Sequence, residues 1–360
     1  MKEKLKSIVI FFTIISLFIQ KNEAKVKIRE HVNLADTIKF KNFPKEIDII
    51  LNEFLKLDDA YVRQLFLNDS SLIILDLKAK SNYFFQQYSL KNKNLIRSFL
   101  KRGAKFGEVI VGFSGGIYNN ENFWFHDISL SKLVTASITK NSTNDEFVRM
   151  TQFNLPYFYH SIQVKDSTTL FAEGARHAEN KIQELNLYSG KEKNLFDSYN
   201  YRPSNTPYYS WKGAHEGFLY IKPTKDKLVI AYSFTDKIEI FDLKIGKSKI
   251  ISGPINFETK FTARNREGRD EAVIDEEAKY AFINGFLTDK YIYLLYSGKN
   301  GHFAKQDQAN LIYVYDWNGS PVAKIKCNKE ITAFTVSDDN TVIYAFDQET
   351  KYVVSAKLKM

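Results

Sequence analysis

The chain has 360 residues, of which 44% are hydrophobic and 15% aromatic, and it contains 16 Gly and 7 Pro. This length and composition permit one large all-β domain or two smaller domains, and they exclude collagen-like and wholly disordered chains. The formal net charge is +9, but no basic run or aromatic-basic module concentrates it, so we expect no nucleic-acid partner.

The first 24 residues have the pattern of a secretory signal peptide. Lysines at positions 2, 4 and 6 precede an apolar run from Ile8 to Ile19, and polar residues follow. This run is shorter than the roughly twenty apolar residues that cross a bilayer. We therefore expect residues 1–24 to be a signal peptide with a weak cleavage position at Ala24. The mature chain would lack a transmembrane helix and lie in the periplasm, at the cell surface or outside the cell.

The single cysteine, Cys327, cannot form an intramolecular disulfide. A lipid-anchored chain would carry a cysteine directly after the apolar run, but Gln20 and Lys21 stand there. We therefore expect no lipid anchor. Cys327 lies in an alternating apolar stretch, which predicts that it packs in a strand.

The N-terminal segment, residues 25–56, contains the strand-like stretch "NLADTIKFKNF" at Asn33–Phe43. The first inner strand is expected near Tyr61–Leu67.

From there on, six segments repeat one pattern of alternating strand, short polar turn and alternating strand. They span residues 71–100, 122–138, 168–196, 227–251, 291–326 and 341–359. A further apolar stretch precedes several of them, such as "EVIVGFS" at 108–114 and "GFLYIKP" at 217–223. Each unit therefore predicts an inner strand followed by two or three more strands, over about 45 to 60 residues.

Three repeats share a glycine-containing hairpin turn, at residues 187–191, 241–247 and 315–320. Four-stranded antiparallel units at this spacing are typical of β-propeller blades. A single blade cannot bury both of its faces, so neighbouring blades pack face to face around a ring. We therefore predict an all-β fold, a six-bladed β-propeller over residues 57–360.

The last unit supplies only three strands after Glu330, and an unpaired edge would be prone to aggregation. The stretch Asn33–Phe43 is our candidate for the missing strand, which would join the last blade and close the ring. The alternative architecture, two separate β-sandwiches, predicts no common register along the chain.

The C-terminal third resembles a known family in the phrases "DKYIYLLYSGK" (289–299), "IYVYDWNGSPVAKIK" (312–326) and "EITAFTVSDDNTVIYAF" (330–346). Together with "RSFLKRGAKFGE" (97–108), they resemble the TolB-like six-bladed propellers, common as exported proteins and lipoproteins of Bacteroidetes. The resemblance covers roughly Leu57 to the C-terminus and implies the fold. It implies no activity, because the family has no agreed biochemical function. The chain departs from members with a lipoprotein signal by lacking their cysteine.

Motifs for catalysis are weak. "GFSGG" (112–116) matches G-x-S-x-G, but a nucleophile elbow needs a helix after the turn, and here a turn and another strand follow. Ser114 is therefore not expected to be a nucleophile. The histidines lack metal-ligand spacing, and one cysteine excludes a structural zinc site. We predict no catalytic residue, no metal and no cofactor.

The long loops indicate where a ligand would bind. In a propeller, the connections from an outer strand to the next inner strand share a face with the loops between second and third strands. The insertions of this chain fall in such loops, at residues 101–108, 173–180, 201–217, 260–279 and 297–308. All five would surround one mouth of the central channel. The candidate ligand-binding residues in them are Arg176, His177, Trp211, His215, Glu216, Arg264, Arg266, Arg269 and His302.

Arginine forks suit carboxylate or phosphate ligands, and Trp211 with the tyrosines before it offers flat faces that stack on sugars or side chains. The favoured function is a non-catalytic binding or scaffold propeller that captures a protein, peptide or glycan partner. One alternative is a hydrolase or lyase for an anionic or sugar substrate, with His177, His215 and His302 converging as acid and base. Another is that each residue is an ordinary solvated or loop-packing side chain.

Overall fold

The computed structural model describes residues 36–78, 82–118, 122–137, 149–196, 202–301 and 305–360. The predicted signal peptide, residues 1–24, lies outside the described residues. Across the described part of the chain, no helix has the length and apolar character needed to cross a membrane.

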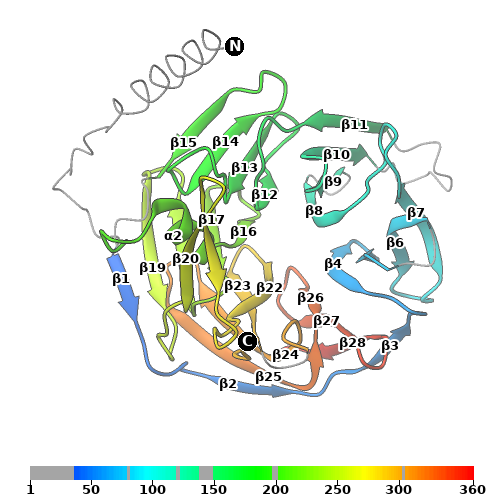
Figure 1. Cartoon of the computed structure of the whole chain (residues 1–360). Coiled ribbons are helices and arrows are strands. Elements are labelled where there is room, and N and C mark those ends of the chain that lie inside the picture. Colours follow the sequence, from blue (N-terminus) through cyan, green and yellow to red (C-terminus); the bar gives the residue numbers. More distant parts are fainter. Residues whose placement is uncertain (1–35, 79–81, 119–121, 138–148, 197–201, 302–304) are drawn as a thin grey trace, which may run out of the picture. The chain divides into compact units, whose positions relative to one another are not determined.

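Six antiparallel sheets, each contributing four strands, form the blades of a ring (Figure 1). Blade 1 comprises β4 (Val62–Asn68), β5 (Ser71–Asp76), β6 (Tyr83–Ser89) and β7 (Leu95–Lys101). Blade 2 comprises β8 (Gly112–Tyr118), β9 (Asn122–Asp127), β10 (Lys132–Ser137) and β11 (Arg149–Asn154). Blade 3 comprises β12 (Ser161–Val164), β13 (Thr169–Glu173), β14 (Ile182–Asn186) and β15 (Glu192–Leu195).

The second half of the ring continues the same order. Blade 4 comprises β16 (Gly217–Ile221), β17 (Lys227–Tyr232), β18 (Lys237–Asp242) and β19 (Lys247–Ser252). Blade 5 comprises β22 (Phe282–Leu287), β23 (Tyr291–Tyr296), β24 (Ala309–Asp316) and β25 (Pro321–Ile331). Blade 6 comprises β26 (Ala333–Val336), β27 (Val342–Asp347), β28 (Tyr352–Lys357) and β3 (Asn52–Lys56). The predicted fold class is confirmed: a six-bladed propeller closed by an N-terminal strand in the last blade.

The hydrophobic core is divided among the blade interfaces. Six clusters of buried side chains occur in the described part of the chain, one between each pair of neighbouring blades. Each inner strand also contacts the inner strands on both sides of it, from β4 around the ring and back to β4. A blade is thus stabilised by burying its two faces against two neighbours, as the repeat predicted.

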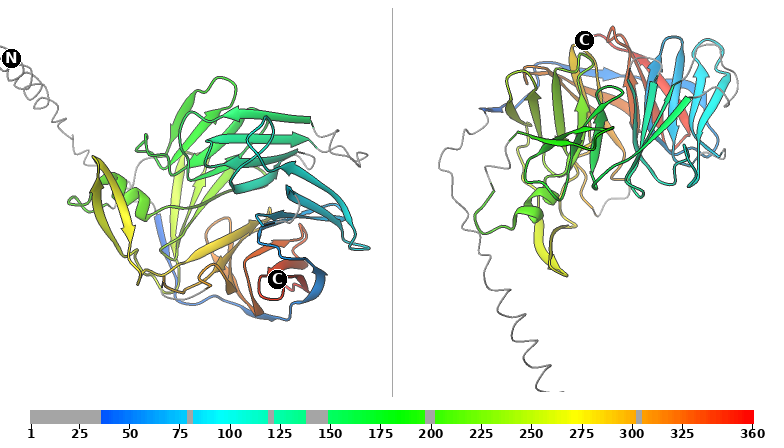
Figure 2. Two further views of the ribbon diagram at one scale, coloured as in Figure 1. Left: turned by 45° about the vertical axis from the view of Figure 1, so that its right-hand side comes forward. Right: turned by 90° about the horizontal axis from the view of Figure 1, so that it is seen from above.

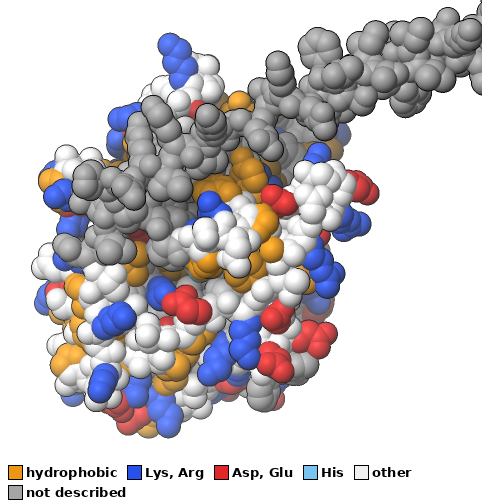
Figure 3. All heavy atoms as spheres, turned by 60° about the vertical axis from the view of Figure 1, so that its left-hand side comes forward, with side chains coloured by type: hydrophobic (Ala, Val, Ile, Leu, Met, Phe, Trp, Pro, Cys, Tyr) orange, Lys and Arg blue, Asp and Glu red, His pale blue; other side chains and the backbone are white. Residues whose placement is uncertain are grey.

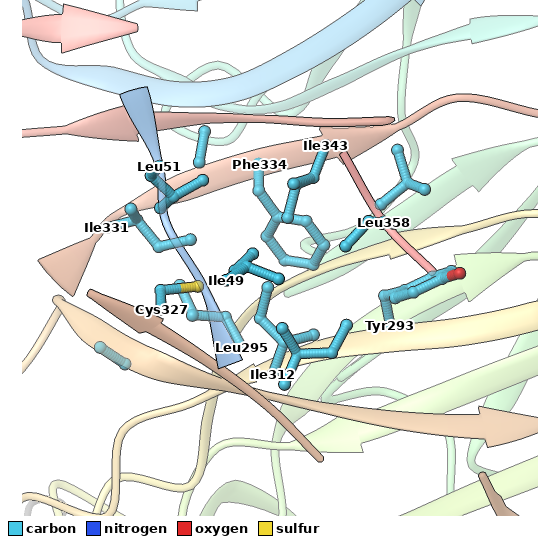
Figure 4. Close-up of a cluster of buried hydrophobic side chains, with 14 of the residues drawn as sticks. Ile49, Leu51, Tyr293, Leu295, Ile312, Cys327, Ile331, Phe334, Ile343 and Leu358 are labelled. Atoms are coloured by element: carbon cyan, nitrogen blue, oxygen red, sulfur yellow. The ribbon is translucent and has the colours of Figure 1, made fainter. Parts of the chain in front are cut away.

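The cluster between blades 5 and 6 contains Cys327 (Figure 4). Its side chain is 1% exposed and lies among Ile49, Leu295 and Ile331. Burial raises the pKa of the thiol to about 12, so the side chain is a neutral, packed group. The expected packing role of Cys327 is confirmed.

The N-terminal segment follows the outer edge of the ring past three blades (Figure 1). Strand β1 (Asp36–Lys39) pairs in parallel with β19, and β2 (Glu46–Ile49) pairs in parallel with β25. Strand β3 pairs antiparallel with β28 and completes blade 6. The prediction that Asn33–Phe43 closes the ring is therefore wrong. Ile38, Phe40 and Phe43 of that stretch pack instead in the cluster between blades 4 and 5.

Between blades 4 and 5 the chain forms a hairpin, β20 (Phe261–Arg266) and β21 (Arg269–Ile274), which stands out from one face of the ring (Figure 2). The short helix α2 (Tyr208–Ala214) packs against it, and Ser210 Oγ donates a hydrogen bond to Glu271 O at 2.9 Å. The predicted loops 201–217 and 260–279 therefore contain regular structure and support each other.

Charged side chains are mixed over the surface. In the view of Figure 3, Lys and Arg side chains are spread over the molecule with Asp and Glu side chains between them. The excess of positive charge is not gathered into one patch on this face.

Candidate functional site

A cavity of about 330 Å³ lies at the mouth of the central channel. It is on the face formed by the outer-to-inner connections and by the loops between second and third strands, as the sequence predicted. The residues that line it are Tyr61, Val62, Arg63, His160, Glu216, Phe218, Ser233, Phe234, Tyr280, Phe282, Ile283, Gln306, Asp307 and Thr332.

Two of the five predicted loops contribute side chains to this cavity. Glu216 comes from the loop 201–217, and Gln306 and Asp307 come from the loop 297–308. Ser233 and Phe234 come from a short turn of blade 4 that the sequence did not single out. The channel mouth is therefore built partly from insertions and partly from the first residues of inner strands.

Arg63 is the charged residue that the inner strands place in this cavity. The register between β4 and β5 shifts at Arg63, between Val62 and Gln64, which is a β-bulge. Bulges redirect side chains and are frequent beside binding sites. The guanidinium lies over the ring of Phe218, with its carbon atom 5.2 Å from the ring centroid. Burial lowers the pKa of Arg63, but an arginine stays charged under all ordinary conditions.

Asn284 supports the bulge from across the channel. A matching register shift between Phe282 and Asn284 places a bulge in β22 as well. The Asn284 side-chain amide donates to Arg63 O at 3.0 Å and to Thr332 O at 3.1 Å, so it joins β22 to β4 and to the residue just before β26. Asn284 is 6% exposed, and breaking these bonds would leave buried carbonyl groups unsatisfied.

Two glutamine side chains link neighbouring blades near Arg63. Gly115 N donates to Gln64 Oε1 at 3.0 Å, which links blades 1 and 2. Gln163 Nε2 donates to Leu219 O at 2.8 Å, which links blades 3 and 4. Gln64, Gln163 and Arg63 also line a second, smaller cavity of about 20 Å³.

An acidic cluster with one histidine forms another wall. His160 Nδ1 lies 3.4 Å from Glu173 Oε2, and His160 Nε2 lies 3.9 Å from Glu216 Oε2. Gly174, with φ of +77°, allows this approach, because a Cβ there would lie 2.3 Å from the Cβ of His160. Burial alone would lower the pKa of His160, but the two carboxylates raise it above its ordinary 6.5. Burial likewise raises the pKa of Glu216.

These shifts predict a pH-dependent stability that His160→Gln should lack. The folded protein holds the His160 proton to higher pH than the unfolded chain does. The stabilisation is therefore fully present below about pH 6.5 and is lost as the pH rises through the folded-state pKa. Glu216 also has a raised pKa, but it is present in both proteins, so the difference between them reports on His160. We expect the difference in melting temperature, wild type minus variant, to decrease as the pH is raised from 5.5 to 8. A constant difference would contradict this.

Lys212 holds the loop that carries Arg176 and His177. Its ammonium donates to Ala175 O and Ala178 O, each at 2.7 Å, and the side chain is 3% exposed. Burial lowers the pKa of Lys212 to about 8. The helix α2 therefore fixes a neighbouring loop of the same face through a buried cation.

The predicted site residues occupy different environments. Arg264, Arg266 and Arg269 are exposed on the projecting β20–β21 hairpin. The guanidinium carbon of Arg176 lies 5.7 Å from the centroid of the Phe158 ring. His177 Nε2 lies 2.9 Å from Glu192 Oε1.

Trp211 and His215 pack on each other, with ring centroids 4.1 Å apart. His215 is 2% exposed, its Nδ1–H donates to Trp211 O at 2.9 Å, and burial lowers its pKa to about 4. It is therefore a neutral packing residue at neutral pH. His302 lies outside the described residues, and of the nine candidates only Glu216 is among the described residues that line the cavity. A ligand-binding role for these residues remains a prediction.

Arg63, Asn284 and the place of His160 in the cavity were not predicted from the sequence. A partial signal for Arg63 was present, because it is a charged residue at the start of a strand predicted to be innermost, and such a start lies at one mouth of the channel. Among the described residues, no group of three or more His, Cys, Asp or Glu side chains could hold a metal ion.

Comparison with known proteins gives a family. A model of the TolB-like 6-blade propeller-like family matches residues 42–339, whereas no curated protein matches the chain. The β-propeller domain of Cps50 (Swd1) from Myceliophteria thermophila is 10% identical with a TM-score of 0.48, covering 86% of this chain and 100% of that one. Raptor from Chaetomium thermophilum is 9% identical with a TM-score of 0.48, covering 89% of this chain and 30% of that one. Because the family model covers most of its length, the chain belongs to the TolB-like 6-blade propeller-like family.

Proposed function

We propose that this chain is an exported, non-catalytic binding propeller of the kind common in Bacteroidetes. It captures a protein, peptide or glycan partner on the face that carries the channel mouth. The observation that supports this most directly is the cavity of about 330 Å³, which combines aromatic walls with a few charged and polar groups. Ligand pockets usually have this composition and measure roughly 300–1,000 Å³.

The surroundings of the cavity also favour binding of a larger partner. The β20–β21 hairpin projects from the ring, and Phe106, Tyr157 and Phe158 are exposed in connections that begin two of the blades. A ligand segment in the cavity could therefore continue over loops of the same face. Loops on a rigid scaffold commonly carry binding residues.

The alternative, a hydrolase or lyase using His177, His215 and His302, receives less support from the described residues. His177 contacts Glu192 and stacks on Tyr157 with ring centroids 3.6 Å apart. His215 is buried beneath Trp211. Neither lines the cavity, so this pair does not form the acid–base site that the alternative requires.

The proposal is tested by screening the purified protein on peptide and glycan arrays together with two variants of the binding face. Ser233→Trp fills the cavity, and the triple substitution of Arg264, Arg266 and Arg269 by Ala strips charge from the hairpin. All three arginines are exposed, so thermal unfolding of the triple variant should be nearly unchanged. We expect capture to be lost in both variants.

A double variant of the opposite face, Tyr188→Ala with Ile245→Ala, is the control. Both side chains are highly exposed, at 70% and 66%, in turns between third and fourth strands. Antiparallel order places those turns at the other end of the blades. Capture that survives in the two binding-face variants but fails in this control would reject the proposed face.

A further inference from the structure

The charges of the channel-mouth cavity are compensated within the protein. The charge of Asp307 acts on Arg63, and both residues line the cavity. His160 Nδ1 lies 3.4 Å from Glu173 Oε2, and His160 Nε2 lies 3.9 Å from Glu216 Oε2. A charged ligand of either sign would therefore meet like charge in the cavity, and such contacts oppose binding. We expect the ligand to be uncharged.

Several polar groups nevertheless line the same cavity, so an entirely apolar ligand fits it poorly. The carboxylates of Glu216 and Asp307 only accept hydrogen bonds, the Arg63 guanidinium only donates them, and the Gln306 amide does both. An apolar ligand would take these groups out of water without replacing their hydrogen bonds. A hydroxyl group both donates and accepts, so a ligand with several hydroxyl groups can bind to groups of both kinds.

Part of the cavity wall is aromatic. Phe234 and Tyr280 are both partly exposed, and their ring centroids lie 5.1 Å apart with the ring planes inclined at 60°. A pyranose ring has an apolar face of C–H groups and an edge of hydroxyl groups. It can therefore pack on an aromatic ring while its hydroxyl groups reach polar side chains. A linear polyol lacks such a face, and a neutral peptide group carries fewer donors and acceptors.

We propose that the channel mouth binds one sugar ring of an uncharged glycan, with its C–H face on Phe234 and Tyr280 and its hydroxyl groups on Arg63 and Asp307. This inference rests on the proposed function and selects the glycan among its classes of partner. The cavity of about 330 Å³ holds one ring with its hydroxyl groups, so the rest of the glycan lies over the surrounding loops.

The test compares matched sugars by titration in saturation-transfer difference NMR. The probes are the methyl glycosides of D-glucose, D-galactose and D-mannose, each with its own uronate and 2-amino sugar, and the linear polyol D-glucitol. We expect one parent glycoside to bind at least about fivefold more tightly than its uronate, its amino sugar and D-glucitol. Irradiation of the aromatic protons of the protein should transfer saturation to the C–H protons of the bound ring.

A variant of the aromatic wall tests the packing of the ring. Phe234→Ala should weaken binding of the parent glycoside by about three- to tenfold, because it removes the surface under the sugar. Phe106→Ala is the matched control. Phe106 is 71% exposed in a connection of the same face, and it is not among the residues that line the cavity. Its replacement should leave binding of every probe unchanged.

A variant of the rim tests the compensation of charge. Asp307 is exposed, so Asp307→Asn should leave the fold intact. It should weaken binding of the parent glycoside by about threefold or more, because a charged acceptor is lost. It also leaves Arg63 less compensated, so the affinity of the uronate should rise relative to that of the parent. Asp289→Asn, in the exposed turn between β22 and β23, is the control and should change neither affinity. If Phe234→Ala does not fold, this reversal decides the question.

The remaining outcomes separate the inference from the proposed function. A uronate or amino sugar that binds more tightly than every parent glycoside would overturn the uncharged ligand. D-Glucitol binding as tightly as the best parent would overturn the packed ring. Tighter binding of the neutral peptide probe N-acetyl-L-phenylalaninamide, lost in Ser233→Trp, would overturn the glycan and leave the binding function standing. Absence of binding by every sugar overturns the inference, and the function fails as well if array capture survives in Ser233→Trp and in the triple arginine variant.

Discussion

Replacing Glu239 by alanine is expected to lower the free energy of unfolding by about 3–5 kcal/mol. Glu239, on β18, lies 2.7 Å from Lys181 Nζ, and the two side chains are 1% and 6% exposed. Tyr232 Oη and Ser248 Oγ donate to the same carboxylate at 2.8 and 2.6 Å. The substitution would remove the anion that compensates a buried ammonium at the interface between blades 3 and 4. Urea unfolding followed by tryptophan fluorescence measures the loss.

Two comparisons show whether the loss comes from the buried charge. Glu277→Ala removes the carboxylate of an exposed pair, Lys260–Glu277, and should leave the midpoint unchanged. Replacing Lys181 by Met and Glu239 by Leu together should restore most of the stability, because two apolar side chains leave no uncompensated charge. A Glu239→Ala midpoint equal to that of the wild type would show that water reaches Lys181 without cost.

A chain that starts at Leu57 is expected to lose the cooperative unfolding transition that a chain starting at Asp36 retains. The shorter chain lacks β3, so the edge of β28 is unpaired in blade 6. It also lacks the buried side chains of Phe43, Ile49 and Leu51. Burial of such side chains contributes about 1.5–3 kcal/mol each, so the total is comparable with the 5–15 kcal/mol stability of a typical domain.

Differential scanning calorimetry of the two chains provides the measurement. A point variant separates chain length from the contacts themselves: Leu51→Asp in the full chain places a charge in the cluster between blades 5 and 6 and should also lower the melting temperature. Identical melting temperatures for the two chain lengths would mean that blade 6 is stable with three strands.

The fold could be predicted because its signals are local and repeated. The expected strand at Tyr61–Leu67 is β4, Val62–Asn68, and the packing of Cys327 followed from its alternating neighbours. The closing strand could not be found in this way. Residues Asn52–Lys56 show no clear apolar alternation, and their exposure in the folded chain follows no two-residue period. Their pairing depends on β28, about three hundred residues later.

The site was harder to predict than the fold. The channel mouth was expected from topology, and Glu216 from its loop. The β-bulge that directs Arg63 into the cavity is a tertiary feature, and so is the hydrogen bond from Asn284 to Arg63 O on another strand. A single sequence displays neither of them. Insertions in the sequence also point to exposed loop residues rather than to polar side chains at the start of inner strands, where Arg63 lies.

The N-terminal segment also imposes an order on folding. Strands β1, β2 and β3 pair with blades 4, 5 and 6 in turn, and Leu51 N donates to Asn328 Oδ1 across 277 residues of sequence. Strand β3 leaves the ribosome early but finds its partner last, because β28 is made at the end of translation. Contacts of such long sequence separation slow folding, so we infer that ring closure is a late step that follows the completion of synthesis.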